Sequence, residues 1–161
     1  MTRQRPGELR ASAYVCEAVS CLSTASHDIL TGLGAQVAAT DMTDVEIKRV
    51  GCLGLCAAGP LVLIPETGEL FSRVRPDALE PIVEALAAVT PGAARVAESA
   101  FFDRQVRIAT ENSGRIDPES LDDYVGAGGY ASLRRVITTM TPAEVREEIT
   151  TSGLRGRCGA G

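Results

Sequence analysis

Four of the five cysteines form two close pairs, and these pairs constrain the fold of the 161-residue chain more than any other feature. Cys16 and Cys21 are separated by four residues, Cys52 and Cys56 by three, and thirty residues lie between the two pairs. Each pair follows a segment with strand character. Thirty residues are enough for one helix and one strand, so we expect the two cysteine loops to meet in the folded chain.

The fifth cysteine, Cys158, leaves an odd count, which argues against a framework of disulfides and for a metal site or a reactive thiol. Residues 1–10 are polar and rich in arginine, and they lack the apolar segment of a secretory signal. We therefore expect a cytoplasmic protein, in which thiols stay reduced.

Four converging thiolates suit two kinds of metal centre. A 2Fe–2S cluster takes two sulfur ligands on each iron, and a structural zinc ion takes four ligands at the corners of a tetrahedron. A third interpretation is a set of buried cysteines without a metal, because free cysteine is a common core residue. A dithiol redox site has less support, since the chain has no Cys-x-x-Cys motif.

The loop of the second pair, residues 51–60, is rich in glycine. Gly51, Gly54 and Gly59 remove side-chain bulk, so backbone N–H groups can approach the sulfur atoms and stabilise negative charge there. Neither loop contains Lys or Arg, so the amides must supply this stabilisation. The apolar side chains that we expect to exclude water are Leu53, Leu55, Val19 and Leu22.

Composition and charge exclude several classes of protein. Hydrophobic residues make up 45% of the chain and charged residues 23%, which is typical of an ordinary globular protein. The formal net charge is −5, which argues against nucleic acid as a partner. No apolar stretch approaches the roughly 18 to 20 residues that a membrane-spanning helix needs, so we expect no membrane span.

Hydrophobic periodicity and turn residues predict an α/β fold, with the order β-α-β-β-β-α in the first ninety residues. We expect Gly32 and Gly34 to end the first helix, Pro76 to lie in the first turn of the second, and Asp117 to cap a third. Thr141 and Glu144 form the pattern of a capping box. The expected strands are residues 11–16, 45–50, 60–64 and 70–74, and the expected helices are residues 23–33, 76–89, 117–124, 130–140 and 142–153.

The cysteine motifs resemble a known family. Cys16-x4-Cys21, followed by Gly51-Cys52-x-Gly54-x-Cys56-x-x-Gly59-Pro60, is similar to the pattern of the thioredoxin-like ferredoxins, which include the 24-kDa subunit of respiratory complex I. Further along, the chain resembles the opening of the 51-kDa flavin-binding subunit. The residues that carry this second resemblance are 101–102, 114–118, 124, 128–130 and 152–157.

A fusion of these two parts resembles the diaphorase subunits of NAD(P)-linked bidirectional hydrogenases and NAD-dependent formate dehydrogenases. The resemblance implies a thioredoxin-like 2Fe–2S ferredoxin domain followed by a small, mostly helical segment. The implied divisions are a polar segment at residues 1–10, the 2Fe–2S domain at 11–89, a linker at 90–100, and the beginning of the flavoprotein region at 101–161.

The same resemblance implies a function in one-electron transfer, with Cys16, Cys21, Cys52 and Cys56 as cluster ligands. The alternative is a zinc-stapled interaction module without a redox role. The implied partners are a flavoprotein region or subunit and other iron–sulfur subunits. FMN and NAD(P) belong only to the complete family protein, so we expect the chain alone not to oxidise NADH.

The glycine-rich loop at the end of the sequence departs from the family pattern Gly-Arg-Gly-Gly-Ala-Gly, because Cys158 stands where the family has glycine. In the family this loop brings backbone N–H groups close to nucleotide and flavin phosphates. The resemblance therefore implies a partial nucleotide or flavin loop at Gly156, Arg157, Gly159, Ala160 and Gly161.

Overall fold

A computed structural model describes residues 9–90 and 104–156 of the chain. The chain divides into two compact units, and the boundary in the sequence lies between Asp123 and Tyr124. The first unit contains β1 (Ala11–Cys16), α1 (Val19–Leu22), α2 (Ser26–Ala39), β2 (Val45–Val50), the short 3-10 helix η1 (Cys56–Ala58), β3 (Val62–Ile64), β4 (Glu69–Phe71) and α3 (Glu80–Ala88). Then follow α5 (Leu121–Gly126), which spans the boundary, α6 (Ala131–Thr139) and α7 (Pro142–Ser152).

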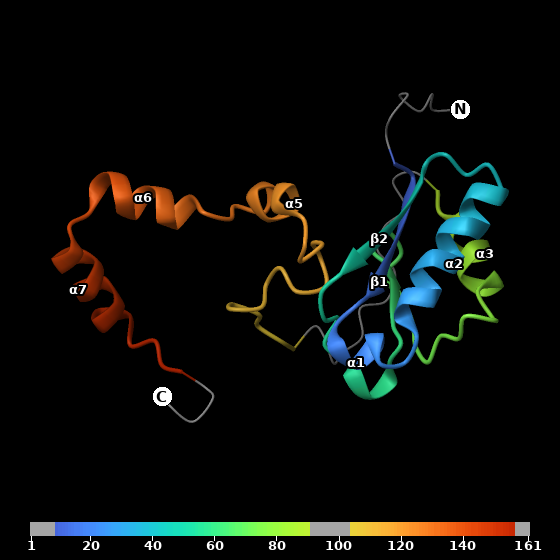
Figure 1. Cartoon of the computed structure of the whole chain (residues 1–161), viewed down its shortest axis with the longest axis horizontal. Helices are drawn as coiled ribbons and strands as arrows, with labels where there is room; N and C mark the ends of the chain where they lie inside the picture. Colours follow the sequence, from blue (N-terminus) through green and yellow to red (C-terminus); the bar gives the residue numbers. More distant parts are fainter. Residues whose placement is uncertain (1–8, 91–103, 157–161) are drawn as a thin grey trace. The chain divides into compact units, whose positions relative to one another are not determined.

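The four strands form one sheet in the order β2-β1-β3-β4 (Figure 1). β1 and β2 are parallel, and Cys16 is paired with Val50 at their carboxyl ends. β3 runs antiparallel to both β1 and β4. Because parallel strands end at the same side of a sheet, the residues that follow β1 and β2 emerge together. This arrangement brings the two cysteine loops to one place.

The main core lies between the sheet and two helices, α2 and α3, which pack together on one face of the sheet (Figure 1). Alternate residues of β1 (Ala11, Ala13 and Val15) are fully buried on that face. They contact the apolar stripes of the helices, such as Leu33 of α2 and Leu86 of α3. The predicted α/β architecture and the strands over residues 11–16 and 45–50 are thereby confirmed.

The first long helix differs from the prediction. Gly32 and Gly34 do not end it, because α2 continues to Ala39. Ile29, Leu33 and Val37 recur at intervals of four residues and are all buried, so the apolar stripe extends the helix beyond the glycines. A Cβ at position 32 would lie only 2.7 Å from Leu79 Cδ1, so the glycine there permits close packing rather than termination.

Other expected bounds are also wrong. α2 begins at Ser26 rather than at residue 23, and β3 begins at Val62 rather than at residue 60. α3 begins at Glu80 rather than near Pro76, and β4 covers Glu69–Phe71 rather than residues 70–74. Asp117 Oδ1 does accept a hydrogen bond from the Glu119 backbone N–H, at 2.9 Å, but this closes a turn and α5 begins only at Leu121.

The helices at the end of the described chain follow the prediction closely. α6 begins one residue after Tyr130, and α7 begins with the predicted capping box of Thr141 and Glu144 and ends before Gly153. None of the helices within residues 9–90 and 104–156 is long and apolar enough to cross a membrane. The linker expected at residues 90–100 and the motif at 101–102 lie outside the described residues, apart from Thr90.

Candidate metal centre

The two cysteine pairs lie together at the carboxyl ends of β1 and β2. Cys16 is the last residue of β1, and Cys52 follows β2 by two residues. Cys16 and Cys21 share a buried apolar cluster with Val50, Leu53 and Leu61, which is separate from the main core. The structure therefore places both pairs at the same end of the sheet.

The first pair, Cys16 and Cys21, is buried, with only 1% of each residue exposed. Burial, together with the adjacent Cys16 as hydrogen-bond partner and as a like charge, raises the pKa of the Cys21 thiol to about 12. Two buried thiolates cannot lie side by side here unless a positive charge balances their negative charges. Positively charged iron would supply that compensation, because metal binding displaces the thiol protons.

The second pair, Cys52 and Cys56, lies at the surface. Their sulfur atoms are 3.6 Å apart, which places them in direct contact. The hydrogen bond and the charge of Cys52 raise the pKa of the Cys56 thiol above its usual value, with a smaller contribution from Cys16. The two pairs therefore influence each other electrostatically, as neighbours around one centre must.

Backbone amides point at the sulfur atoms, as the glycine-rich loop predicts. The N–H of Gly54 donates to Cys52 Sγ at 3.3 Å, and the φ of 94° at Gly54 is one that other residues rarely adopt. The backbone N–H of Leu61 donates to Cys21 and lowers its pKa, against the larger effect of burial. These donors stabilise negative charge on sulfur in the way that metal–thiolate sites require.

Gly59 permits the close approach of the loop to Cys21. A Cβ built on Gly59 would lie 2.9 Å from Cys21 Sγ and 3.3 Å from the carbonyl oxygen of Cys56. Among the described residues, no three Cys, His, Asp or Glu side chains are arranged around a single ion, and the thiols are held as two adjacent pairs. Two such pairs fit a 2Fe–2S cluster, in which each iron takes two protein sulfurs.

Two of the four apolar side chains expected to exclude water do not do so. Val19 is 84% exposed and Leu22 is 45% exposed. α1 is a single helical turn in which Cys21 points inward, so residues two before and one after it point elsewhere. Leu53 is buried as predicted, and Leu61, which was not predicted, completes the apolar wall with it.

A distant segment also reaches this site, and no sequence pattern indicated this contact. The Ser113 hydroxyl donates to the carbonyl oxygen of Cys52 at 2.8 Å. The backbone N–H of Gly51 donates to the carbonyl oxygen of Ile116 at 3.4 Å. Arg107 Nη2 donates to the carbonyl oxygen of Leu53 at 3.3 Å.

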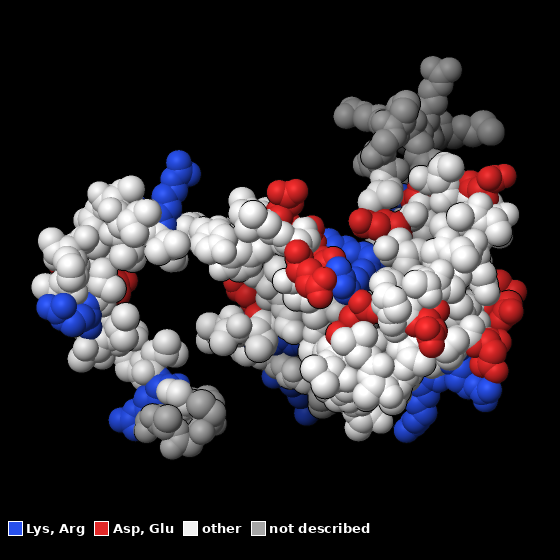
Figure 2. All heavy atoms as spheres, viewed as in Figure 1, with Lys and Arg blue, Asp and Glu red and all other residues white. Residues whose placement is uncertain are grey.

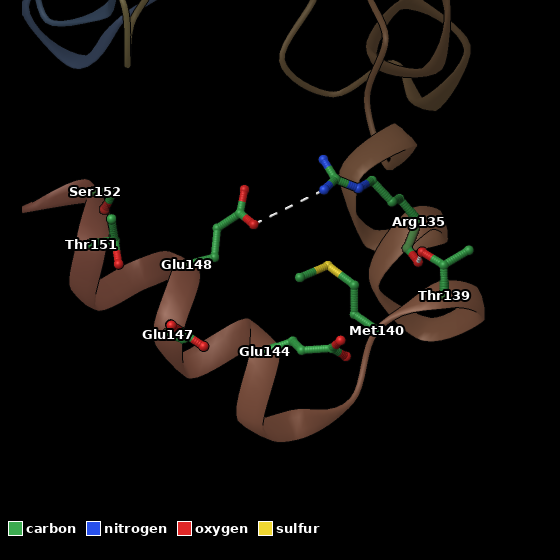
Figure 3. A pocket seen from close by; sticks show the side chains of 8 residues that line it. All are labelled: Arg135, Thr139, Met140, Glu144, Glu147, Glu148, Thr151 and Ser152. Atoms are coloured by element: carbon green, nitrogen blue, oxygen red, sulfur yellow. Dashed lines mark hydrogen bonds and ion pairs between the residues drawn. The ribbon is translucent and has the colours of Figure 1, made fainter.

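Only one residue of the partial nucleotide loop lies within the described part of the chain. Gly156 is exposed, whereas Arg157, Gly159, Ala160 and Gly161 lie outside the described residues, as does Cys158. The second unit has a polar groove between α6 and α7 (Figure 3). Arg135 and Glu148 face each other across this groove at 4.0 Å, and it contains none of the predicted site residues.

Comparison with known proteins places residues 2–87 in one family. This stretch matches the family model of the thioredoxin-like 2Fe-2S ferredoxins. A crystal structure of the thioredoxin-like 2Fe-2S ferredoxin from Aquifex aeolicus aligns with 58% of this chain and all of that chain. The alignment has 20% sequence identity and a TM-score of 0.45.

Two curated proteins are similar over shorter stretches. The NADP-reducing hydrogenase subunit HndC of Solidesulfovibrio fructosivorans is 60% identical over 58 residues, which are 36% of this chain and 12% of HndC. The 2Fe-2S ferredoxin of Clostridium pasteurianum is 31% identical over 65 residues, which are 40% of this chain and 64% of that ferredoxin. The chain thus spans less than two thirds of either relative.

Proposed function

The chain belongs to the thioredoxin-like 2Fe-2S ferredoxins, and from this premise we propose that Cys16, Cys21, Cys52 and Cys56 hold its cluster. The family carries a 2Fe–2S cluster and transfers electrons, which selects the cluster over structural zinc. The observation that carries the ligand assignment is the meeting of the two thiol pairs at the ends of two parallel strands.

The chain's own groups have separate tasks in this proposal. The cluster supplies one-electron redox chemistry when it is bound. The four thiolates bind the irons, and the N–H groups of Gly54 and Leu61 stabilise the negative charge on sulfur. Leu53 and Leu61 exclude water on the buried side.

The two pairs also differ in their access to a partner. Cys56 is exposed and Cys52 is half-buried, whereas Cys16 and Cys21 are buried. Electron transfer between proteins is fastest where the redox group is close to the surface. We therefore assign the side of Cys52 and Cys56 as the side that a redox partner contacts.

We further propose that the protein serves in an NAD(P)-linked oxidoreductase, as part of the diaphorase of a hydrogenase or a formate dehydrogenase. The similarity to HndC over 58 residues supports this assignment. FMN and the nicotinamide nucleotide would be held by a flavoprotein partner, because a one-electron cluster cannot accept hydride. The chain mixed with NADH and ferricyanide should then consume NADH no faster than a blank.

The ligand assignment is tested by iron and sulfide analysis of four single variants, each with one cysteine of the two pairs replaced by alanine. The purified chain should contain two irons and two sulfides, the composition of this cluster. Each of the four variants should lose most of both, and Cys158→Ala should retain them as the matched control. Full iron and sulfide in any of the four, or zinc without sulfide in the parent chain, would remove the assignment.

A further inference from the structure

Arg107 brings a basic side chain to the loop of the second cysteine pair. Its guanidinium bridges two segments, donating from Nη2 to the carbonyl oxygen of Leu53 at 3.3 Å and from Nη1 to that of Ser113 at 3.5 Å. The side chain is half-buried. Neither cysteine loop has a basic residue of its own, so this charge comes from a residue fifty-one positions after Cys56.

The segment that carries Arg107 follows the loop closely. Gly114 has a φ of 78°, and a Cβ there would lie 2.8 Å from Leu53 Cδ2 and 3.3 Å from the carbonyl oxygen of Cys52. Gly114 therefore supplies both the backbone conformation and the room for this contact. With the hydrogen bond from Ser113 to Cys52, the segment contacts the loop at the cysteine itself.

Ion pairs hold the same segment against β2. Arg49 lies 3.3 Å from Asp117 and 2.9 Å from Glu119, and Lys48 pairs with Asp123. On the face drawn in Figure 2, one group of basic side chains near the centre of the view lies directly beside acidic ones. The position of residues 107–117 is thus set by contacts with the loop and with β2, and Arg107 has a defined place beside the loop.

A fixed positive charge beside this loop affects the reduction of the cluster more than the binding of the cluster. Reduction adds one electron to a cluster that is already negative through its four thiolates. A neighbouring cation stabilises the reduced form more than the oxidised form, and partial burial limits screening of that interaction by water and salt. Arginine keeps its charge throughout the pH range in which proteins are stable.

We propose that Arg107 is a positioning residue that fixes the Cys52 loop and raises the reduction potential of the cluster. This inference rests on the assignment of the four cysteines as ligands. It extends the functional unit beyond residues 2–87, the stretch that matches the family model. The segment around residues 107–117 then belongs to the redox site as well as to the chain that follows it.

The test compares three variants of the full chain: Arg107→Gln, Arg107→Lys and Arg115→Gln. Arg115 is the matched control, since it is an exposed arginine on the same segment and its replacement makes the same change in net charge. In a redox titration, Arg107→Gln should lower the ratio of reduced to oxidised cluster at a fixed potential by roughly three- to tenfold, tenfold being about 59 mV. Arg107→Lys should keep most of the potential, and Arg115→Gln should keep the parent value.

A second readout uses the chain without iron. The amide of Gly51, which is bonded to Ile116, should exchange hydrogen faster in Arg107→Gln than in the parent chain or in Arg115→Gln. Equal exchange rates, or an Arg107→Gln potential equal to that of Arg115→Gln, would overturn the inference. A parent chain that assembles no cluster would instead contradict the ligand assignment, so the two failures are distinguishable.

Discussion

Replacement of Gly59 by alanine tests the packing of the candidate centre. Alanine readily adopts the φ of −68° and ψ of 163° found at Gly59, so the substitution causes no backbone strain. The new Cβ would lie 2.9 Å from Cys21 Sγ, at least about 0.6 Å closer than an ordinary contact. Because Cys21 is only 1% exposed, its sulfur is surrounded by protein atoms rather than by solvent.

We expect Gly59→Ala to destabilise the iron-free chain by about 1 to 3 kcal/mol, the usual cost of overpacking. For a unit of this size each kcal/mol lowers Tm by roughly 4 to 8 °C. Displacement of the Cys21 sulfur should also lower the iron bound per chain after reconstitution. Thermal unfolding of the iron-free chain and iron analysis measure the two effects separately.

Gly34→Ala is the matched control, because the same methyl group placed there meets nothing within 4 Å. Gly34 lies inside α2, where alanine is more favourable than glycine by about 1 kcal/mol, so this variant should unfold at a higher temperature. If Gly59→Ala unfolded at or above the parent Tm and bound iron fully, the close contact at Cys21 would not exist as described.

Two further predictions concern residues outside the cysteine loops. Hydrogen bonds from Lys48 and from the Asp117 backbone N–H hold the pKa of Asp123 below its usual value of about 3.9. The ionised Asp123 therefore stabilises the folded chain above that pH, and this stabilisation is lost as the pH falls through the lowered pKa. The Tm difference between the parent and Asp123→Asn should therefore be present at pH 7 and shrink as the pH falls below the usual pKa of an aspartate; a difference that stays constant would refute the pairing. Thr141→Ala removes the capping box of α7 and should cost about 1 kcal/mol locally. Amides in the first turn of α7 should then exchange about fivefold faster, and unchanged exchange would show that the cap contributes nothing.

The strands and cysteine loops could be predicted because their signals are local. A short apolar run of β-prone residues identified β1 to the residue, and strict alternation identified β2. The glycines around Cys52 anticipated the amide that donates to its sulfur. The capping box joins Thr141 and Glu144, which are three positions apart, so it too could be predicted from the sequence. Each of these features depends on neighbours within a few positions.

The errors arose where distant residues decide the outcome. Gly32 is typical of a helix end, yet it lies inside α2, where Leu79 from the N-cap of α3 packs closely against it. Pro76 and Pro81 both suit a first helical turn, and only the folded chain shows that α3 starts beside Pro81. Arg107 reaches Leu53 across 54 positions, and nothing near either residue signals that contact.

The pairing of β2 with residues 117–123 has a consequence for self-association. Lys48 and Arg49 are successive residues of a strand, so their side chains leave opposite faces of the sheet. Both nevertheless pair with residues of this one stretch, which must therefore cross the outer side of β2, the terminal strand of the sheet. An open terminal strand offers a row of N–H and C=O groups to which another chain can add by edge-to-edge pairing. A shortened chain ending at residue 90 would keep all four cysteines and lose this protection, and its aggregation would then reflect an uncovered edge rather than a defective metal site.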